Sequence, residues 1–298
     1  MEEIQRKLQI LIPQYKENES VLKDLLESIK MQQGINKEEI GVIIVNDGSE
    51  VVLDESVLSE YDFDIKYIIN KEHLGVSYTR QTALNNSEAE YVMFCDADDM
   101  FIDSLAIRKI LDYIRDGFDA LVFAFYEQVS FEKFKLHSEN DCTFVHGKVY
   151  NKKFLKENEI EWKTSLIKHE DLYFNCWALA VADNVIRDKT PIYLWKYNKN
   201  SVTRNGDFIM DSYADMINSY NCLVDKLLLI GQEKNAAINA YLLICISRKI
   251  WKIKTEYNLD DFKEKVWRFR RKRIRLIRSK LSQEERVYWN KCVYEGRI

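Results

Sequence analysis

The sequence predicts an α/β fold, with a mostly parallel sheet and flanking helices, followed by a helical C-terminal region. Short apolar runs alternate with helix-length amphipathic segments in the first half of the chain, a pattern that indicates βαβ units. Turn-forming or acidic residues follow several of the apolar runs. After residue 207 every segment has helical spacing. We therefore expect a catalytic α/β domain over residues 1–205 and a helical region over 206–298.

The expected strands are short apolar or β-branched runs. The run 8–12 ends at Pro13, and the run 41–45 ends at the turn Asn46-Asp47-Gly48-Ser49. Further strands are expected at 65–69, 91–95, 120–126, 131–136 and 193–197.

The expected helices have apolar residues at intervals of three and four. Residues 20–33 carry Val21, Leu25, Leu26 and Ile29 on one face. Further helices are expected at 76–85, 104–114, 151–158, 172–182, 208–230, 234–256, 259–280 and 282–294.

Composition indicates a globular protein of a reducing compartment. The 298 residues are 46% hydrophobic and 31% charged, which is ordinary for soluble proteins. The six cysteines are scattered without a Cys-x-x-Cys pair, so we expect buried thiols and neither disulfides nor a zinc site. The N-terminus has no apolar signal core, and the longest apolar stretch, near 236–246, is too short to span a bilayer. The chain is therefore expected to be cytoplasmic.

Three carboxylates follow the apolar run 91–95 within four positions: Asp96, Asp98 and Asp99. Crowded carboxylates repel one another, and a divalent cation with oxygen ligands, Mn²⁺ or Mg²⁺, is the usual partner of such a cluster. Taken alone, the same residues fit an acidic turn that caps the following helix equally well.

Other polar motifs also follow strands. Pro13 and Tyr15 close the first strand, Asp47 closes the second, and a helix that begins near Gly75 and carries Arg80 follows the third. Ligands on parallel sheets bind at the carboxyl ends of the strands, so these residues are expected to share one site with the acidic cluster. A helix N-terminus beside a glycine suits an anionic ligand.

These four segments, in this order, resemble the nucleotide-sugar-binding half of the inverting glycosyltransferases of family 2, which have the GT-A fold. The matching segments are Pro13-Gln14-Tyr15, Asn46-Asp47-Gly48-Ser49, Gly75 to Arg80, and Asp96-Ala97-Asp98-Asp99. The resemblance covers about residues 8–200. Gln14 and Gln81 stand where the family often has asparagine.

The resemblance implies a role for each matching residue. Pro13, Tyr15 and Arg80 would help to hold the nucleoside, Asp47 would contact the base and Asp96 the ribose, and Asp98 would coordinate the metal. Asp99 would support the metal shell or cap the next helix.

The segment His169-Glu170-Asp171-Leu172 resembles the family's Glu-Asp motif, which faces the acceptor. Asp171 is the candidate general base and Glu170 its neighbour, because a hydroxyl becomes an effective nucleophile when a carboxylate removes its proton. An acidic first helical turn is the alternative. Lys148 would meet phosphate or acceptor, or be a solvated lysine, and Arg204 resembles a residue near the pyrophosphate.

The C-terminal region is strongly basic. Residues 263–298 contain 13 Lys and Arg residues against 4 Asp and Glu residues, although the whole chain has a net charge of −4. Aromatic and aliphatic residues interleave with the basic residues of 263–280, as in helices that lie on anionic membranes. Packing against the acidic catalytic domain is the alternative. Nucleic acid is not an expected partner, because the rest of the chain would repel it.

We therefore expect a metal-dependent inverting glycosyltransferase, cytoplasmic or peripheral at the inner face of the plasma membrane. The resemblance implies a nucleoside-diphosphate sugar donor, most commonly a UDP-sugar, and a hydroxyl of a glycan, lipid-linked or protein acceptor in cell-surface glycan synthesis. The alternatives are a nucleotidyltransferase, although residues 14–19 lack its glycine-rich loop, an aspartate-dependent phosphatase, and a non-catalytic nucleotide-sugar-binding protein.

Overall fold

The computed structural model describes residues 6–198, 208–236, 238–240, 279 and 283. The chain divides into two compact units, Met1–Arg204 and Asn205–Ile298. Within the described part of the second unit, the main element is the helix α7 (Phe208–Leu229). Among the described residues, no helix is both long and apolar enough to cross a lipid bilayer.

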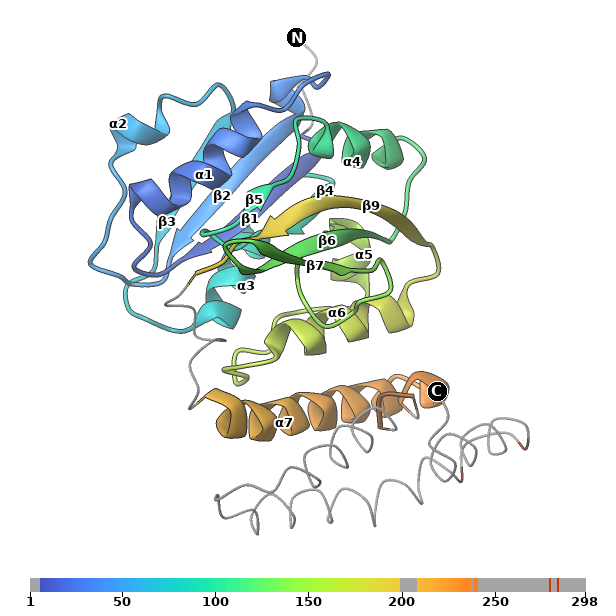
Figure 1. The fold of residues 1–298 in the computed structure, drawn as a ribbon. Helices are drawn as coiled ribbons and strands as arrows, with labels where there is room; N and C mark the ends of the chain where they lie inside the picture. Colours follow the sequence, from blue (N-terminus) through green and yellow to red (C-terminus); the bar gives the residue numbers. More distant parts are fainter. Residues whose placement is uncertain (1–5, 199–207, 237, 241–278, 280–282, 284–298) are drawn as a thin grey trace. The chain divides into compact units, whose positions relative to one another are not determined.

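The first unit is a nine-stranded mixed sheet with helices on its two faces (Figure 1). The strands lie in the order β3-β2-β1-β4-β8-β6-β9-β5, and β7 pairs with β6. They are β1 (Leu8–Gln14), β2 (Ile40–Asn46), β3 (Asp64–Ile69), β4 (Tyr91–Phe94), β5 (Met100–Phe101), β6 (Ala120–Ser130), β7 (Lys133–His137), β8 (Lys148–Asn151) and β9 (Val185–Trp195). The helices are α1 (Glu19–Lys30), the 3₁₀ turn η1 (Lys37–Glu39), α2 (Glu55–Leu58), α3 (Val76–Asn86), α4 (Ala106–Ile114), α5 (Lys152–Glu157) and α6 (Glu170–Val181).

The predicted mostly parallel sheet is confirmed. Strands β3, β2, β1 and β4 are parallel neighbours, and β6 and β9 are parallel to each other. Strand β8 lies antiparallel between β4 and β6, so these two outer neighbours run in the same direction. Strands β8 and β5, helix α2 and the turn η1 were not predicted, and only the end of β9 was.

The central strands β1, β2 and β4 are buried on both faces, which explains the two helical layers. Ile10, Val42 and Met93 of the central strands share one core with α1 and α4, and this core includes Leu25 of α1 and Ile110 of α4. Helices α3, α5 and α6 lie on the other side of the sheet in Figure 1. The arrangement leaves the carboxyl ends of β1, β2 and β4 at one edge.

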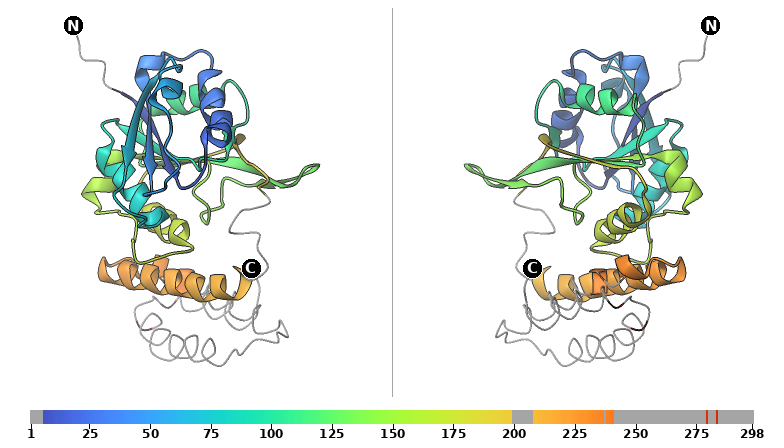
Figure 2. Two further views of the ribbon diagram at one scale, coloured as in Figure 1. Left: turned by 90° about the vertical axis from the view of Figure 1, so that its left-hand side faces the viewer. Right: turned by 90° about the vertical axis from the view of Figure 1, so that its right-hand side faces the viewer.

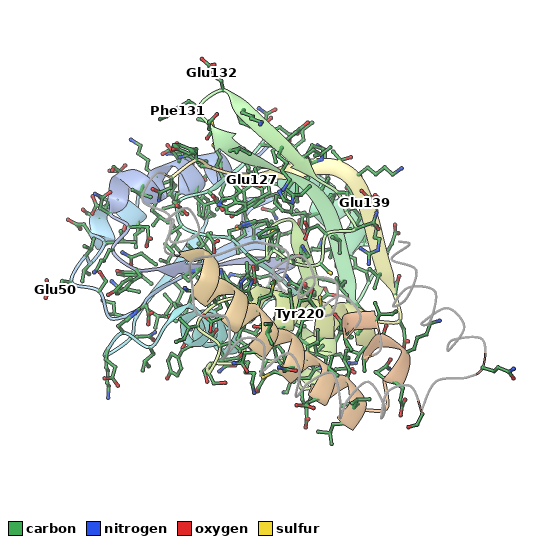
Figure 3. The ribbon with its side chains drawn as sticks, turned by 60° about the horizontal axis from the view of Figure 1, so that its bottom comes forward. Glu50, Glu127, Phe131, Glu132, Glu139 and Tyr220 are labelled. Carbon is green, nitrogen blue, oxygen red and sulfur yellow. The ribbon has the colours of Figure 1, made fainter. Side chains whose placement is uncertain are left out.

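The hairpin β6–β7 extends beyond the body of the sheet (Figure 2). Figure 3 shows Phe131 and Glu132 at its tip. The Phe131 side chain is 81% exposed, although its ring lies 5.3 Å from the ring of Tyr197.

Gly48, at the turn after β2, has a conformation and a packing that exclude other residues. Its φ is +67°, and a Cβ atom there would lie 2.2 Å from the carbonyl carbon of Glu72. Gly117 has a similar φ of +74°, but its Cβ would meet only the Tyr91 hydroxyl at 4.0 Å.

We expect Gly48→Ala to destabilise the protein considerably more than Gly117→Ala. The left-handed conformation should cost about 1–2 kcal/mol in both variants, and the overlap with Glu72 should add about 1–3 kcal/mol in Gly48→Ala. Denaturant unfolding of the two variants measures the difference. Equal free energies of unfolding would show that the turn after β2 can move away from Glu72.

Candidate functional site

Asp47 fastens the end of β2 to the loop that precedes α3. Its carboxylate accepts hydrogen bonds from the backbone N–H groups of Leu74 and Gly75, each at 2.9 Å, and lies 2.8 Å from Nδ1 of His73. The Asp47 side chain is 4% exposed. Both oxygens of the predicted base-contacting residue are therefore held by the protein, which fixes the loop at the start of α3.

An aromatic pair lies beside this loop. The Tyr15 ring stacks on the His73 ring, with centroids 4.1 Å apart and planes 20° apart. Tyr15 is 36% exposed, and Pro13 at the end of β1 is partly exposed. Gln14 points into the protein instead and donates to the carbonyls of Glu17 and Val51. The strand end thus presents an aromatic surface to which a planar base could bind by stacking.

Arg80 joins two parts of the site that are distant in sequence. Its side chain is 5% exposed, and its two terminal nitrogens donate to Asp96 at 2.7 Å and to Glu170 at 2.8 Å. The guanidinium also lies 4.8 Å from the centre of the Trp162 ring. Arg80 was predicted to hold the nucleoside, and here it connects the end of β4 with the start of α6.

The acidic cluster after β4 is held by the last strand of the sheet. The Tyr193 hydroxyl accepts from the Asp96 N–H at 3.0 Å and donates to Asp99 at 2.7 Å. The other Asp99 oxygen accepts from the backbone N–H of Lys196 at 2.9 Å. Asp99 is fully buried, and its hydrogen bonds join the loop after β4 to β9 and to the chain that follows β9.

Asp98 lies in the same cluster and is only partly exposed. It accepts a hydrogen bond from the Asn198 side chain at 2.8 Å. Burial, reinforced by the charge of Asp96, raises the pKa of Asp98. Burial likewise raises the pKa of Glu17, helped by the charges of Asp98 and Asp96; no sequence motif marked this carboxyl. A cation at this position would relieve the repulsion among these groups.

The described residues offer a donor set that fits a divalent cation. Oxygens of Asp96 and Asp99 and a ring nitrogen of His146 lie within 4.8 Å of one another. The Nδ1 atom of His146 is buried without a hydrogen-bond partner among the described residues, and burial lowers the pKa of this imidazole to about 4, so the ring is neutral. The spacing of residues in the sequence did not indicate His146 as a metal ligand, because Asp96 and Asp99 are about 50 positions away and only the folded chain brings the three together.

The predicted base and its neighbour lie at the start of α6. Burial raises the pKa of both Glu170 and Asp171, and the positive charge of Arg80 opposes the increase. Asp171 accepts a hydrogen bond from the backbone N–H of Leu172 at 2.8 Å and is partly exposed. The preceding residue, His169, has a left-handed backbone conformation with φ of 58°. This conformation is unfavourable for a residue with a side chain, and residues that adopt it are found most often at functional sites.

The remaining predicted positions are Lys148, Arg204 and the basic stretch 263–280. Lys148 is not a solvated lysine, because it is buried and its ammonium group donates to the carbonyls of Phe144 and His146. Arg204 lies outside the described residues, and so does every residue of the basic stretch 263–280 except Ser279.

The chain belongs to glycosyl transferase family 2. The model of that family matches residues 9–178, and this match confirms the resemblance found in the sequence. Glycosyltransferase GlyA of Streptococcus pneumoniae is 28% identical over 229 residues, which are 66% of this chain and 32% of that protein. The teichoic acid poly(glycerol phosphate) polymerase of Staphylococcus epidermidis is 30% identical over 182 residues, 57% of this chain and 24% of that protein. The chain therefore spans a third or less of the length of these two relatives.

A solved structure confirms the fold. The crystal structure of residues 1–349 of S. aureus TarS in complex with UDP-GlcNAc matches with a TM-score of 0.67 and 19% identity, covering 98% of this chain and 92% of that one. This likeness establishes the predicted GT-A architecture for the chain.

Proposed function

We propose that this chain transfers one sugar from a nucleoside-diphosphate sugar to an acceptor hydroxyl, with inversion at the anomeric carbon. The single observation that supports the proposal most is the Arg80 bridge, which joins Asp96 at the end of β4 to Glu170, the neighbour of the proposed base Asp171. Membership of glycosyl transferase family 2 supports the reaction class.

The donor is a UDP-sugar in this proposal. A TarS structure of similar fold is described as a complex with UDP-GlcNAc. In this chain, the exposed Tyr15 ring would stack on the base, while Asp47 would support the nucleoside through the loop that it fixes. Asp96, which keeps 32% of its side chain exposed beside Arg80, would bond the ribose.

The residues of the acidic cluster would hold Mn²⁺ or Mg²⁺. Asp98 is the ligand that the family resemblance implies, and the atoms close enough to one another to share a cation belong to Asp96, Asp99 and His146. Such an ion, when bound, offsets the negative charge of a departing diphosphate. The raised pKa of Asp98 supports this assignment, since a group that ionises reluctantly without a cation gains from one.

Asp171 acts as the general base. Its partly exposed carboxylate takes the proton of the acceptor hydroxyl while the hydroxyl oxygen attacks the sugar, in a single displacement that inverts the anomeric centre. Burial raises the pKa of Asp171 to about 6, which leaves it ionised at neutral pH yet basic enough to accept a proton. Arg80 contributes by holding the adjacent Glu170 in place.

The acceptor in this proposal is a hydroxyl of a cell-surface polymer or of its lipid-linked precursor. The relatives include a protein named as a teichoic acid polymerase, which supports this class. Residues 206–298 would contact the acceptor, an anionic membrane surface through 263–280, or a partner subunit. The chain would work at the cytoplasmic face of the membrane.

Asp171→Asn should lower turnover by about two to four orders of magnitude, because the amide cannot accept the proton. The assay follows UDP release from UDP-sugars with an added polyol-phosphate or glycan acceptor, and a parallel titration measures nucleotide binding, which should be unchanged. The wild-type rate should fall as the pH decreases through about 6, where Asp171 becomes protonated.

Asp112→Asn is the matched control, because Asp112 is an exposed residue of α4 that pairs with the surface residues Arg108 and Arg115. It should retain full turnover. If Asp171→Asn turned over as fast as the wild type, the base assignment would be refuted. If the wild-type protein bound nucleotide but transferred sugar to none of the acceptors, a non-catalytic binding protein would be favoured.

Asp98→Asn should remove the part of UDP binding that depends on Mn²⁺. UDP at about a hundred times its dissociation constant should stabilise the wild-type protein by about 2.7 kcal/mol, seen as a higher melting temperature. Thermal-shift measurements with UDP, with Mn²⁺ and with both separate the contributions. A variant that keeps the full Mn²⁺-dependent shift would place the cation away from Asp98.

A further inference from the structure

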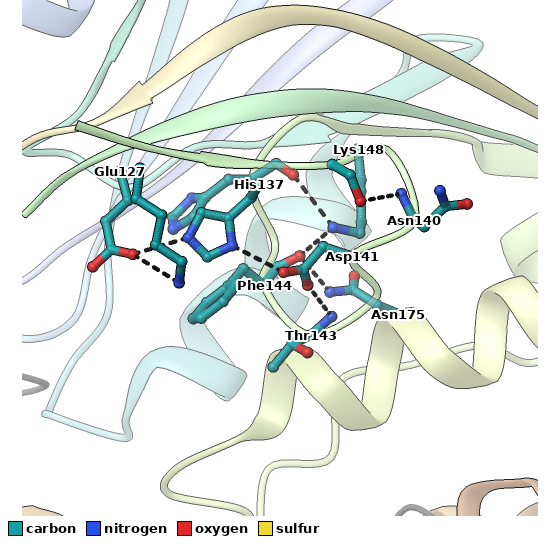
Figure 4. Close-up of polar contacts among 11 residues, drawn as sticks. Glu127, His137, Asn140, Asp141, Thr143, Phe144, Lys148 and Asn175 are labelled. Atoms are coloured by element: carbon teal, nitrogen blue, oxygen red, sulfur yellow. Dashed lines mark hydrogen bonds and ion pairs between the residues drawn. The ribbon is translucent and has the colours of Figure 1, made fainter. Parts of the chain in front are cut away.

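The loop 138–147, which joins β7 to β8, is fixed at its first half by a charged cluster (Figure 4). The two ring nitrogens of His137 lie 2.9 Å from a Glu127 oxygen and 3.0 Å from an Asp141 oxygen. The second Asp141 oxygen accepts from the Thr143 N–H at 2.8 Å. The backbone on both sides of Cys142 is therefore held in one conformation.

The second half of the loop is fixed to α6. The Phe144 carbonyl accepts from the buried Lys148 ammonium group at 2.5 Å and from the side-chain amide of Asn175 at 2.8 Å (Figure 4). Asn175 itself is fully buried and also accepts from the Tyr150 hydroxyl. These bonds hold the loop against the middle of α6.

This arrangement brings two thiols together. Cys176 follows Asn175 directly, and its thiol donates a hydrogen bond to the Cys142 carbonyl at 3.8 Å. Cys142 is partly exposed, whereas Cys176 is buried. Neither thiol has a part in the proposed sugar transfer.

The surroundings make Cys142 the more reactive thiol. The neighbouring side chain of Cys176, helped by the charge of Lys148, lowers the pKa of Cys142 to about 7. The proximity of Cys142 and burial raise the pKa of Cys176, and burial raises the pKa of Cys95. A partly exposed thiol that ionises near neutral pH is the kind that attacks disulfides and peroxides.

We infer that Cys142 and Cys176 form a redox-active dithiol that small disulfides oxidise to an intramolecular disulfide, tying the loop 138–147 to α6. The Cys142 thiolate attacks one sulfur of the small disulfide and releases one thiolate. Cys176 then loses its proton and attacks the Cys142 sulfur, which releases the second thiolate. Two protein thiols and one small disulfide thus give one protein disulfide and two small thiols. Because α6 begins with Glu170 and Asp171, the cross-link would tie the helix of the proposed base to this loop.

The test uses the full-length protein, freed of reductant and treated with hydroxyethyl disulfide. Peptide mapping without reduction should give a cross-linked Cys142–Cys176 peptide, and the melting temperature should rise and return to its original value when dithiothreitol is added. Cys176→Ser should stop the reaction at a stable mixed disulfide on Cys142. Cys142→Ser should give neither product at these two positions.

Cys222→Ser is the matched control, because Cys222 is also partly exposed but lies on α7, and it should form the cross-link as the wild type does. Peptide mapping keeps Cys245 and Cys292, which lie outside the described residues, separate from the pair. Two results with the wild-type protein would overturn the inference. In the first, Cys142 stays reduced; in the second, Cys142 keeps the reagent as a mixed disulfide while Cys176 stays reduced. This result is independent of sugar transfer.

Discussion

The buried guanidinium of Arg80, shared between Asp96 and Glu170, is the interaction on which the site depends. Ionised carboxylates inside a protein are unfavourable unless a cation and hydrogen bonds compensate for lost water. Arg80 supplies both in a planar geometry and stacks on Trp162, which a lysine could not reproduce. The strand end that would meet the donor and the helix that would meet the acceptor are thereby held together.

The rest of the site is held by contacts between distant segments of the chain. Tyr193 of β9 bonds both the Asp96 backbone and the Asp99 carboxylate, and the chain that follows β9 returns to Asp99 and Asp98 through Lys196 and Asn198. The acidic cluster is therefore enclosed by protein on several sides. This enclosure explains the raised pKa of Asp98 and the fit of the cluster to a cation.

The sequence predicted those parts of the fold in which local pattern and burial agree. The apolar runs of β1, β2 and β4 are buried along their whole length, and each ends at a turn or acidic residue, so both the strands and their shared edge could be predicted. Strand β8 was missed because it has four residues and begins with Lys148, whose charge hides its burial. Its ammonium group is compensated by loop carbonyls that only the folded chain brings close. Other features also arise from tertiary contacts that the sequence does not reveal. They are the hydrogen bonds that hold Asp47, the Arg80 bridge, and the position of His146 beside Asp96 and Asp99.

A double-mutant cycle between Arg80 and Glu170 tests the central claim most directly. Arg80→Met, Glu170→Gln and the double variant would be unfolded with denaturant at neutral pH. The buried pair predicts a coupling of about 1.5–3 kcal/mol between the two substitutions. Free energies that add within about 0.5 kcal/mol would show that Arg80 and Glu170 do not interact, and would contradict the account.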